Sequence, residues 1–271
     1  MRGSEFIAAN AGKSLSQWEA AAIEQANQDS FVPWPMVPIE VEIRGWDDNL
    51  THPPMMPPVK HRGRFFVASD YFAIGTPEDY VRLPLTPGAA QSVANTKSML
   101  LPTAKMVEDI WRASTVKLRP SPLVPNKGAN LGQYTDHSRV VDGQIPQGGA
   151  GSLTSGHKKD VILSNIWKPG KVVIYGWHRP DGTFIQPKSN IHGDFYVDYS
   201  HGIRLLSPNM EVDGQSMAVE DVLESSELAL LLSSEGPIRR VRYPALNSAS
   251  PRVSYFDLGF STLVALGRRA A

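Results

Sequence analysis

The chain has 271 residues, of which 41% are hydrophobic and 20% are charged, a composition typical of globular proteins that argues against general disorder. Lys and Arg number 27, as do Asp and Glu, so the formal net charge is zero and nothing indicates a nucleic-acid partner. Because there is no cysteine, disulfides, thiolate–zinc sites and a thiol nucleophile are excluded.

The first six residues, M-R-G-S-E-F, resemble an expression leader with a cloning-site scar, so we expect one domain over residues 7–271. The next residues, A-A-N-A-G-K-S, are small and polar, as at the start of a mature exported chain. No stretch approaches the roughly 18 apolar residues that a membrane span needs. The sequence therefore predicts a soluble protein without a membrane span, secreted or periplasmic after removal of a signal peptide.

Residues 7–118 are predicted to be rich in helix. A capping serine, strong helix formers and one apolar face predict a helix over residues 14–28. Thr86, followed by proline in the first turn, predicts a second helix that runs to about residue 97. Thr103 caps a third helix, whose apolar residues fall on one face.

A proline-rich segment, residues 51–60, separates two predicted strands at 37–44 and 64–68. Its four prolines exclude a helix interior or a central strand. The segment is therefore either a linker or an ordered loop that forms one wall of a cleft, and the methionines and tryptophans nearby favour the loop.

The chain from residue 119 onward contains little predicted helix. Residues 119–151 are rich in Pro, Gly and Asn and predict a long loop, and residues 152–271 are rich in short strands with one helical insert, A-V-E-D-V-L-E-S-S-E-L-A-L-L-L. The predicted strands are 160–165, 171–177, 183–186, 202–207, 210–213, 237–242 and 252–265. Helices early and strands late predict an α+β fold, with a helical N-terminal half packed on a mostly antiparallel C-terminal half.

Residues 157–204 hold four of the seven histidines, and the ionisable clusters of this segment each follow or precede a short β-branched run. Scaffolds often place working side chains at strand ends, and imidazole exchanges a proton near neutral pH. We therefore expect His157, His178 and His201 to lie on adjacent strands and to converge on one cleft.

Ser98 lies in the break between the second and third predicted helices, where amides of a helix N-terminus stabilise negative charge. His157 follows about sixty residues later at the start of a strand, and His178 ends the next strand. This order resembles the NlpC/P60 and wider papain-like hydrolases over roughly residues 95–180, although that family uses cysteine as its nucleophile. The resemblance implies a cell-wall peptide substrate. Alternatively, Ser98 only caps a helix.

The leading interpretation is an exported hydrolase of a peptide, amide or ester bond. Ser98, native or replacing a cysteine, would attack the carbonyl, and His157 would take its proton. Asp160 or His178 would orient the imidazole. The side chains expected to line the cleft and bind substrate are Trp177, Tyr199, His201 and Arg204.

Two alternatives remain open. The first is a non-catalytic carbohydrate- or peptide-binding protein, whose Trp, Tyr and Arg side chains form a recognition surface. The second is a metal-dependent hydrolase, although the spacing of its ligands matches no zinc signature. Its candidate ligands are His192, Asp194, Asp198 and His201. The leading interpretation requires neither a metal nor a cofactor.

A short motif, S-G-H-K at residues 155–158, fits the S-x-x-K pattern of penicillin-binding enzymes. That pattern requires the serine at a helix start, whereas a strand-like V-I-L follows here, and its partner motifs are missing. We therefore assign it no role from the sequence.

Overall fold

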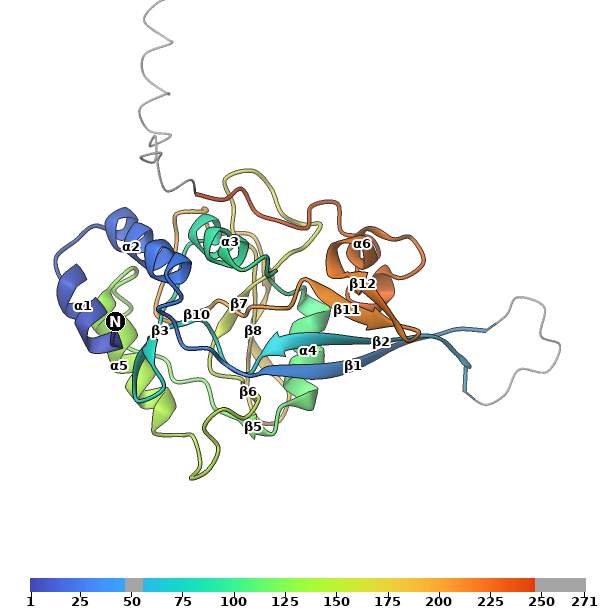
Figure 1. Cartoon of the computed structure of the whole chain (residues 1–271), viewed down its shortest axis with the longest axis horizontal. Helices are drawn as coiled ribbons and strands as arrows, with labels where there is room; N and C mark the ends of the chain where they lie inside the picture. The colour runs from blue at the N-terminus through green and yellow to red at the C-terminus, as the bar shows by residue number, and fades with distance from the viewer. Residues whose placement is uncertain (47–55, 247–271) are drawn as a thin grey trace, which may run out of the picture.

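The computed structural model describes residues 1–46 and 56–246 of the chain (Figure 1). Within these ranges it contains six α-helices and several small, mostly antiparallel sheets, which confirms the predicted α+β class. No helix in the same ranges is long and apolar enough to cross a membrane. The predicted strand at 252–265 and residues 51–55 of the proline-rich segment lie outside the described residues.

The larger sheet joins the two halves of the chain. Its antiparallel strands, in spatial order, are β1 (Met36–Arg44), β2 (Val59–Ala68), β11 (Asn209–Val212) and β12 (Gln215–Ala218). Strand β1 forms one edge of this sheet (Figure 1). Its side chains alternate between the core, where Ile39 and Val41 are buried, and solvent, where Glu40 and Glu42 are exposed.

The second sheet carries most of the histidine-rich segment. Its strands, in spatial order, are β10 (His201–Gly202), β7 (Lys159–Val161), β8 (Ile174–His178) and β9 (Phe184–Ser189). Strand β7 pairs in parallel with β10 and antiparallel with β8. Two small pairs complete the strands: β3 (Ala73–Thr76) with β4 (Asp79–Arg82), and β5 (Val116–Lys117) with β6 (Thr154–Ser155).

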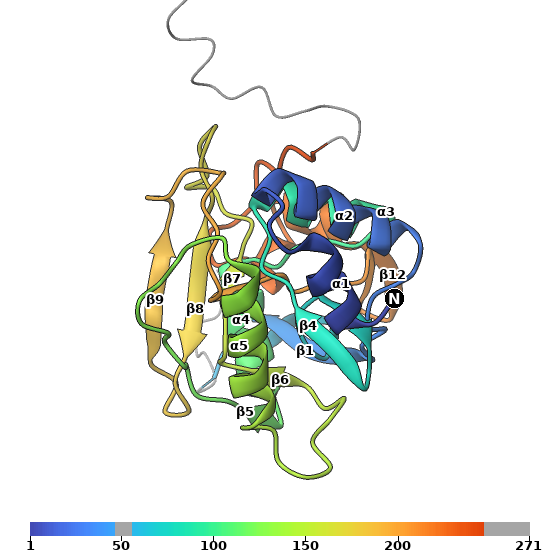
Figure 2. The ribbon, with the colours of Figure 1, turned by 90° about the vertical axis from the view of Figure 1, so that its left-hand side faces the viewer.

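Helices pack on both sheets. They are α1 (Gly3–Asn10), α2 (Leu15–Asn27), α3 (Pro87–Thr96), α4 (Ala104–Ala113), α5 (Leu131–Asp142), α6 (Val219–Glu224) and the short 3₁₀ helix η1 (Ala229–Leu231). In the view of Figure 2, α4 and α5 stand between β8–β9 and the group of α1, α2 and α3. The predicted cap of α4 is confirmed, because the Thr103 side chain accepts a hydrogen bond from the Met106 amide at 3.2 Å.

Two predictions about the first 151 residues were wrong. Residues 1–6 are not outside the fold, because α1 begins at Gly3 and the Phe6 side chain is fully buried in the core. The expected loop at 119–151 contains α5, which Asn130 caps by accepting a hydrogen bond from the Gln133 amide. The Pro-, Gly- and Asn-rich composition of the segment does not predict this helix, because the burial of a few side chains outweighs its low helix propensity.

Two predicted strands in the second half also differ. The strand expected at 202–207 is reduced to β10 and isolated bridges at Leu206. The segment 237–242 forms no strand, because backbone amides in it and next to it donate hydrogen bonds to residues of helices. The Ile238 amide donates to the Leu223 carbonyl, and the Tyr243 amide donates to the Gln91 side chain.

Candidate functional site

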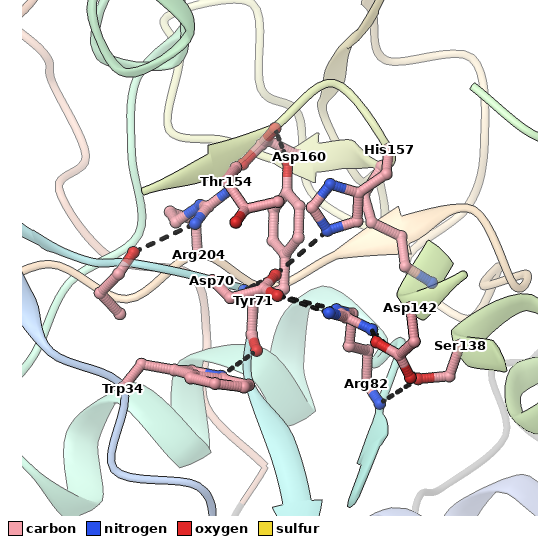
Figure 3. Close-up of polar contacts among 12 residues, drawn as sticks. Trp34, Asp70, Tyr71, Arg82, Ser138, Asp142, Thr154, His157, Asp160 and Arg204 are labelled. Carbon is pink, nitrogen blue, oxygen red and sulfur yellow. Dashed lines mark hydrogen bonds and ion pairs between the residues drawn. The ribbon is translucent and has the colours of Figure 1, made fainter. Parts of the chain in front are cut away.

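Asp70, directly after β2, is the centre of a buried network of charged side chains (Figure 3). One carboxylate oxygen, Oδ2, accepts hydrogen bonds from Nε and Nη2 of Arg82 at 3.0 and 2.6 Å. The other, Oδ1, lies 3.1 Å from Nε2 of His157. Burial alone would raise the pKa of Asp70, but Arg82 and His157 hold it well below its usual range. Asp70 is therefore an ionised, fully bonded anchor.

The partner of His157 is thus Asp70, and the prediction that Asp160 or His178 orients this imidazole was wrong. Burial lowers the pKa of His157 to about 4, so the ring is neutral at neutral pH. A neutral ring bonded to a carboxylate must carry its proton on Nε2. The interior position and the neutral state make His157 part of the anchor and not an accessible base.

Asp160 and Arg204 meet around the ring of Tyr71 (Figure 3). The Tyr71 hydroxyl donates to Oδ2 of Asp160 at 2.8 Å, and the Arg204 guanidinium lies 3.9 Å from the ring centroid. Arg204 also donates to the Thr154 carbonyl at 2.7 Å. Burial raises the pKa of Asp160 to about 6, although Arg204 and Tyr71 oppose the change. A carboxyl with this pKa exchanges protons near neutral pH.

A small cavity of about 10 Å³, here called the inner cavity, lies beside this group. A volume of this size holds about one water molecule. Its polar lining comes from Tyr71, Ser155, Lys158, Asp160, His178 and Arg204. Of the eight residues predicted to form the site, three therefore share this cavity: Asp160, His178 and Arg204.

The glycine at 156 allows the two sides of the inner cavity to approach each other. Its φ is +95°, and a Cβ there would lie 2.3 Å from the Leu118 carbonyl oxygen and 2.9 Å from that of His178. Only glycine fits such a position. The tight turn brings Ser155, at the end of β6, next to the last residue of β8.

His178 is held by Glu108 of α4. Its Nε2 lies 2.9 Å from Glu108 Oε1, which also accepts a hydrogen bond from the Tyr175 hydroxyl. The bond with His178 is the main cause that lowers the pKa of Glu108, so the carboxylate is ionised and Nε2 carries a proton. The Trp111 ring stacks on the imidazole at 5.7 Å between centroids. His178 is therefore oriented by a carboxylate and covered by an indole.

Ser155 and Lys158 border the same cavity. The Ser155 Oγ atom is buried and has no hydrogen-bond partner within the described ranges. The Lys158 ammonium donates to the Tyr199 carbonyl at 2.5 Å, and burial lowers the pKa of this lysine to about 7, with the nearby Arg82 charge acting in the same direction. The S-G-H-K motif, given no role from the sequence, thus supplies a free hydroxyl and a partly neutral amine.

Ser98 lies far along the chain from these groups and at the wrong end of a helix. It follows the C-cap of α3, with φ of +55°, and it is exposed. Helix α4 begins only at Ala104. Ser98 therefore lies in the predicted break between the two helices, but Thr103 caps α4, and no hydrogen bond in the described ranges joins the Ser98 side chain to a histidine.

The remaining predicted binding residues lie outside the inner cavity. Trp177 is buried beneath the Lys159 ammonium, 5.1 Å from the ring centroid, and the Tyr199 hydroxyl accepts from the Leu123 amide at 2.8 Å. His201 is fully buried, both ring nitrogens lack partners within the described ranges, and burial lowers its pKa to about 4. Trp177 and His201 share the sheet of His178, and Tyr199 lies in the turn before β10, but none of the three lines the inner cavity.

The proposed metal ligands do not converge. In residues 1–46 and 56–246, no three His, Asp or Glu side chains are placed to hold one metal ion. Asp198 instead accepts hydrogen bonds from the Tyr196 hydroxyl at 2.8 Å and the Asn126 amide at 2.9 Å, and it also bonds Ser200. The Asp198 carboxylate thus stabilises its own turn.

Sequence reasoning missed Asp70, Tyr71, Arg82, Glu108 and Lys158. The sequence did contain a signal for Asp70 and Tyr71. They come just after the predicted strand at 64–68, and the predicted site residues also lie at the ends of predicted strands. Glu108 gave no such signal, since a glutamate on an amphipathic helix is ordinarily solvent-facing.

Comparisons with protein-family models, curated proteins and solved structures found no match to the chain. The resemblance to NlpC/P60 hydrolases therefore stays a prediction from residue order. What the chain does must be argued from the site itself.

Proposed function

We propose that the chain is a hydrolase of a peptide, amide or ester bond in which Ser155 is the nucleophile and His178 the general base. Glu108 orients the imidazole. One observation supports this assignment best: the unpartnered Ser155 Oγ and the carboxylate-bound His178 border the same water-sized cavity. A nucleophile, a base and a group that orients the base are the three parts of a serine-hydrolase site.

The chemistry follows the usual order for acyl transfer. Because Nε2 of His178 is bonded to Glu108, Nδ1 is the nitrogen left to take the Ser155 proton. Oγ then attacks the carbonyl carbon, and the guanidinium of Arg204 lies beside the cavity to stabilise the oxyanion. Collapse releases the leaving group, which receives its proton from His178. Water enters by the same route to hydrolyse the acyl-enzyme.

Substrate access requires the Trp111 side chain to move. The inner cavity admits about one water, and Trp111, partly exposed, covers His178. On the other side of α4 lies an open groove of about 860 Å³, here called the outer groove, which Glu108 and Tyr175 border. Glu108 therefore connects the space large enough for a substrate to the buried base.

Activity measured on activated esters and a peptide library tests the assignment. Ser155→Ala should lower kcat/KM at least about a thousandfold while the melting curve stays unchanged. Ser98→Ala is the matched control and should keep full activity. Loss of activity in the Ser98 variant, with Ser155→Ala still active, would restore the residue-order interpretation and end this one.

Two finer parts of the proposal have separate support. Cell-wall peptide as the substrate comes from the residue order alone, and hydrolysis of purified peptidoglycan fragments tests it. Export rests on the sequence, and detection of the protein in cell fractions outside the cytoplasm tests it. The alternative of a non-catalytic binding protein is favoured by one feature, the open outer groove, and predicts binding without turnover.

A further inference from the structure

Strand β1 is an edge of the larger sheet, pairs with no described strand other than β2, and borders the outer groove. Three consecutive residues of the strand, Glu40, Val41 and Glu42, line that groove. The opposite wall comes from α4, Tyr175 of β8 and Lys188 of β9. A nine-residue edge strand facing an open groove has the geometry of sites where an extended peptide adds a strand to a sheet.

The backbone groups that face the free edge follow from the register. The amides of Ser207 and Asp213 donate to the carbonyls of Phe66 and Arg62, so even-numbered residues of β2 bond towards β11. Odd-numbered residues of β2 therefore bond β1, and Val41 is opposite Gly63. It follows that Glu40 and Glu42 direct their N–H and C=O groups away from β2.

Two observations agree with this assignment. Pro38, which has no N–H, occupies a position of the same parity as Glu40, as expected for an outward-facing position on an edge strand. No described residue outside β2 forms a backbone hydrogen bond with Glu40 or Glu42. The groove therefore displays at least two donor–acceptor pairs ready for a further strand.

The charges on the exposed face of the sheet indicate what that strand carries. Across β11, β2 and β1, Glu211, Arg64 and Glu40 form a row of alternating sign, and Arg64 Nε bonds Glu40 at 2.5 Å and Nη1 bonds Glu211 at 3.1 Å. Two residues further along the strands, Asp213, Arg62 and Glu42 repeat the order of charges, and Glu42 also bonds Arg44 of its own strand at 2.5 Å. In both rows the next position beyond β1 is complementary to a cation.

Three cations of the groove, Lys105, Arg112 and Lys188, already have carboxylate partners, while Arg62 lies opposite Glu42 on β2. Lys105 and Arg112 both bond Asp109, at 2.7 and 2.6 Å, and Lys188 bonds Glu235 at 2.8 Å. A second copy of β1 is a poor occupant, because it would bring glutamates opposite glutamates. A basic strand is the better fit.

We propose that the outer groove binds an extended peptide segment that pairs with β1 and carries Lys or Arg at alternate positions opposite Glu40 and Glu42. The backbone of β1 supplies the hydrogen bonds, and the two glutamates select the charge. This binding is independent of the proposed hydrolysis. The Ser155→Ala chain is therefore used for the binding measurements, so that a failure of one proposal is seen separately from a failure of the other.

Fluorescence anisotropy with three labelled heptapeptides tests the charge pattern. The probe is acetyl-Thr-Lys-Val-Lys-Val-Lys-Thr-amide; one control replaces each Lys by Glu, and the other has the same composition with its lysines contiguous. The probe should bind at least tenfold more tightly than either control at low salt, and its binding should weaken as salt is raised. Equal binding of the probe and the contiguous control would overturn the proposal.

Variants at Glu40 test the backbone contact. Glu40→Pro removes an outward N–H without breaking the β1–β2 ladder and should weaken probe binding at least tenfold at an unchanged melting temperature. Glu40→Gln keeps the N–H and should cost less, while Glu40→Lys should reverse the preference to the Glu peptide. If Glu40→Pro does not fold, a probe N-methylated at alternate residues makes the same test. Unchanged binding in that experiment would overturn the proposal.

Discussion

The inner cavity and the outer groove lie on opposite sides of the same helix, α4, yet their charged groups work under different conditions. Around the inner cavity, Asp70, Arg82 and Lys158 are at most 3% exposed, and burial is the leading influence on their pKa values. The ion pairs of the outer groove are less buried: the side chains of Lys105, Lys188 and Arg112 are 24%, 30% and 62% exposed. A buried charge must be paired and shifts the pKa values of its neighbours, whereas an exposed charge remains available to bind a partner molecule.

The largest expected effect comes from breaking the buried anchor. Asp70→Asn removes the negative charge that Arg82 and His157 share but keeps the shape of the side chain. Among the described residues, the Arg82 guanidinium then retains Asp142, at 2.6 Å, as its carboxylate partner. We expect the free energy of unfolding to fall by about 3 kcal/mol, measured by urea denaturation at neutral pH. A loss under about 1 kcal/mol would mean that this buried ion pair contributes no more to the free energy of unfolding than an exposed one.

The next effect, at most as large, is a pH dependence of the free energy of unfolding that depends on Asp160. Because its folded pKa, about 6, lies above the ordinary value, the folded state binds more protons than the unfolded state between about pH 4 and 6. Its contribution to stability therefore falls as the pH rises through this window. Asp160→Asn does not titrate, so its stability relative to the original chain should rise by up to about 3 kcal/mol from pH 4 to pH 7.

The comparison of the two unfolding curves isolates this residue. Asp70 and His157 titrate in both proteins and affect both curves in the same direction, so they cancel in the difference. Parallel pH profiles for Asp160→Asn and the original chain would show that Asp160 is ionised as an ordinary surface carboxylate is.

The sequence could predict what local interactions decide. The caps at Thr86 and Thr103 and the strand at 37–44 depend on neighbours in the chain, and the structure has them. It also placed His178 at the end of a strand, β8, since the β-branched residues before it carry that information, whereas His157 lies in the bend before β7. Ser98 does lie in the predicted break between two helices, but residue order does not say which groups a loop side chain reaches, and here Ser98 follows the C-cap of α3 while Thr103 caps α4.

The rest required tertiary structure. Glu108 looks like any polar residue of an amphipathic helix, and only the packing of α4 against β8 brings it to His178. Asp70 lies in the bend after β2 and Arg82 ends β4, so their pairing is set by how β3 and β4 fold back. The role of S-G-H-K at 155–158 was hidden because its serine is placed by a glycine turn and not by a helix.

The smallest expected effect sharpens the comparison from the outer side. Arg112 bonds Asp109 at 2.6 Å and lies 3.8 Å from Glu108, but its side chain is mostly exposed. Solvent screens such a pair and side-chain entropy opposes it, so Arg112→Gln should lower the free energy of unfolding by at most about 1 kcal/mol. The effect should shrink as salt is added, whereas that of Asp70→Asn should persist. A loss near 3 kcal/mol for Arg112→Gln would show that the groove, like the cavity, is held by its charges, and α4 would then separate two structural sites instead of a buried reaction centre and an open recognition surface.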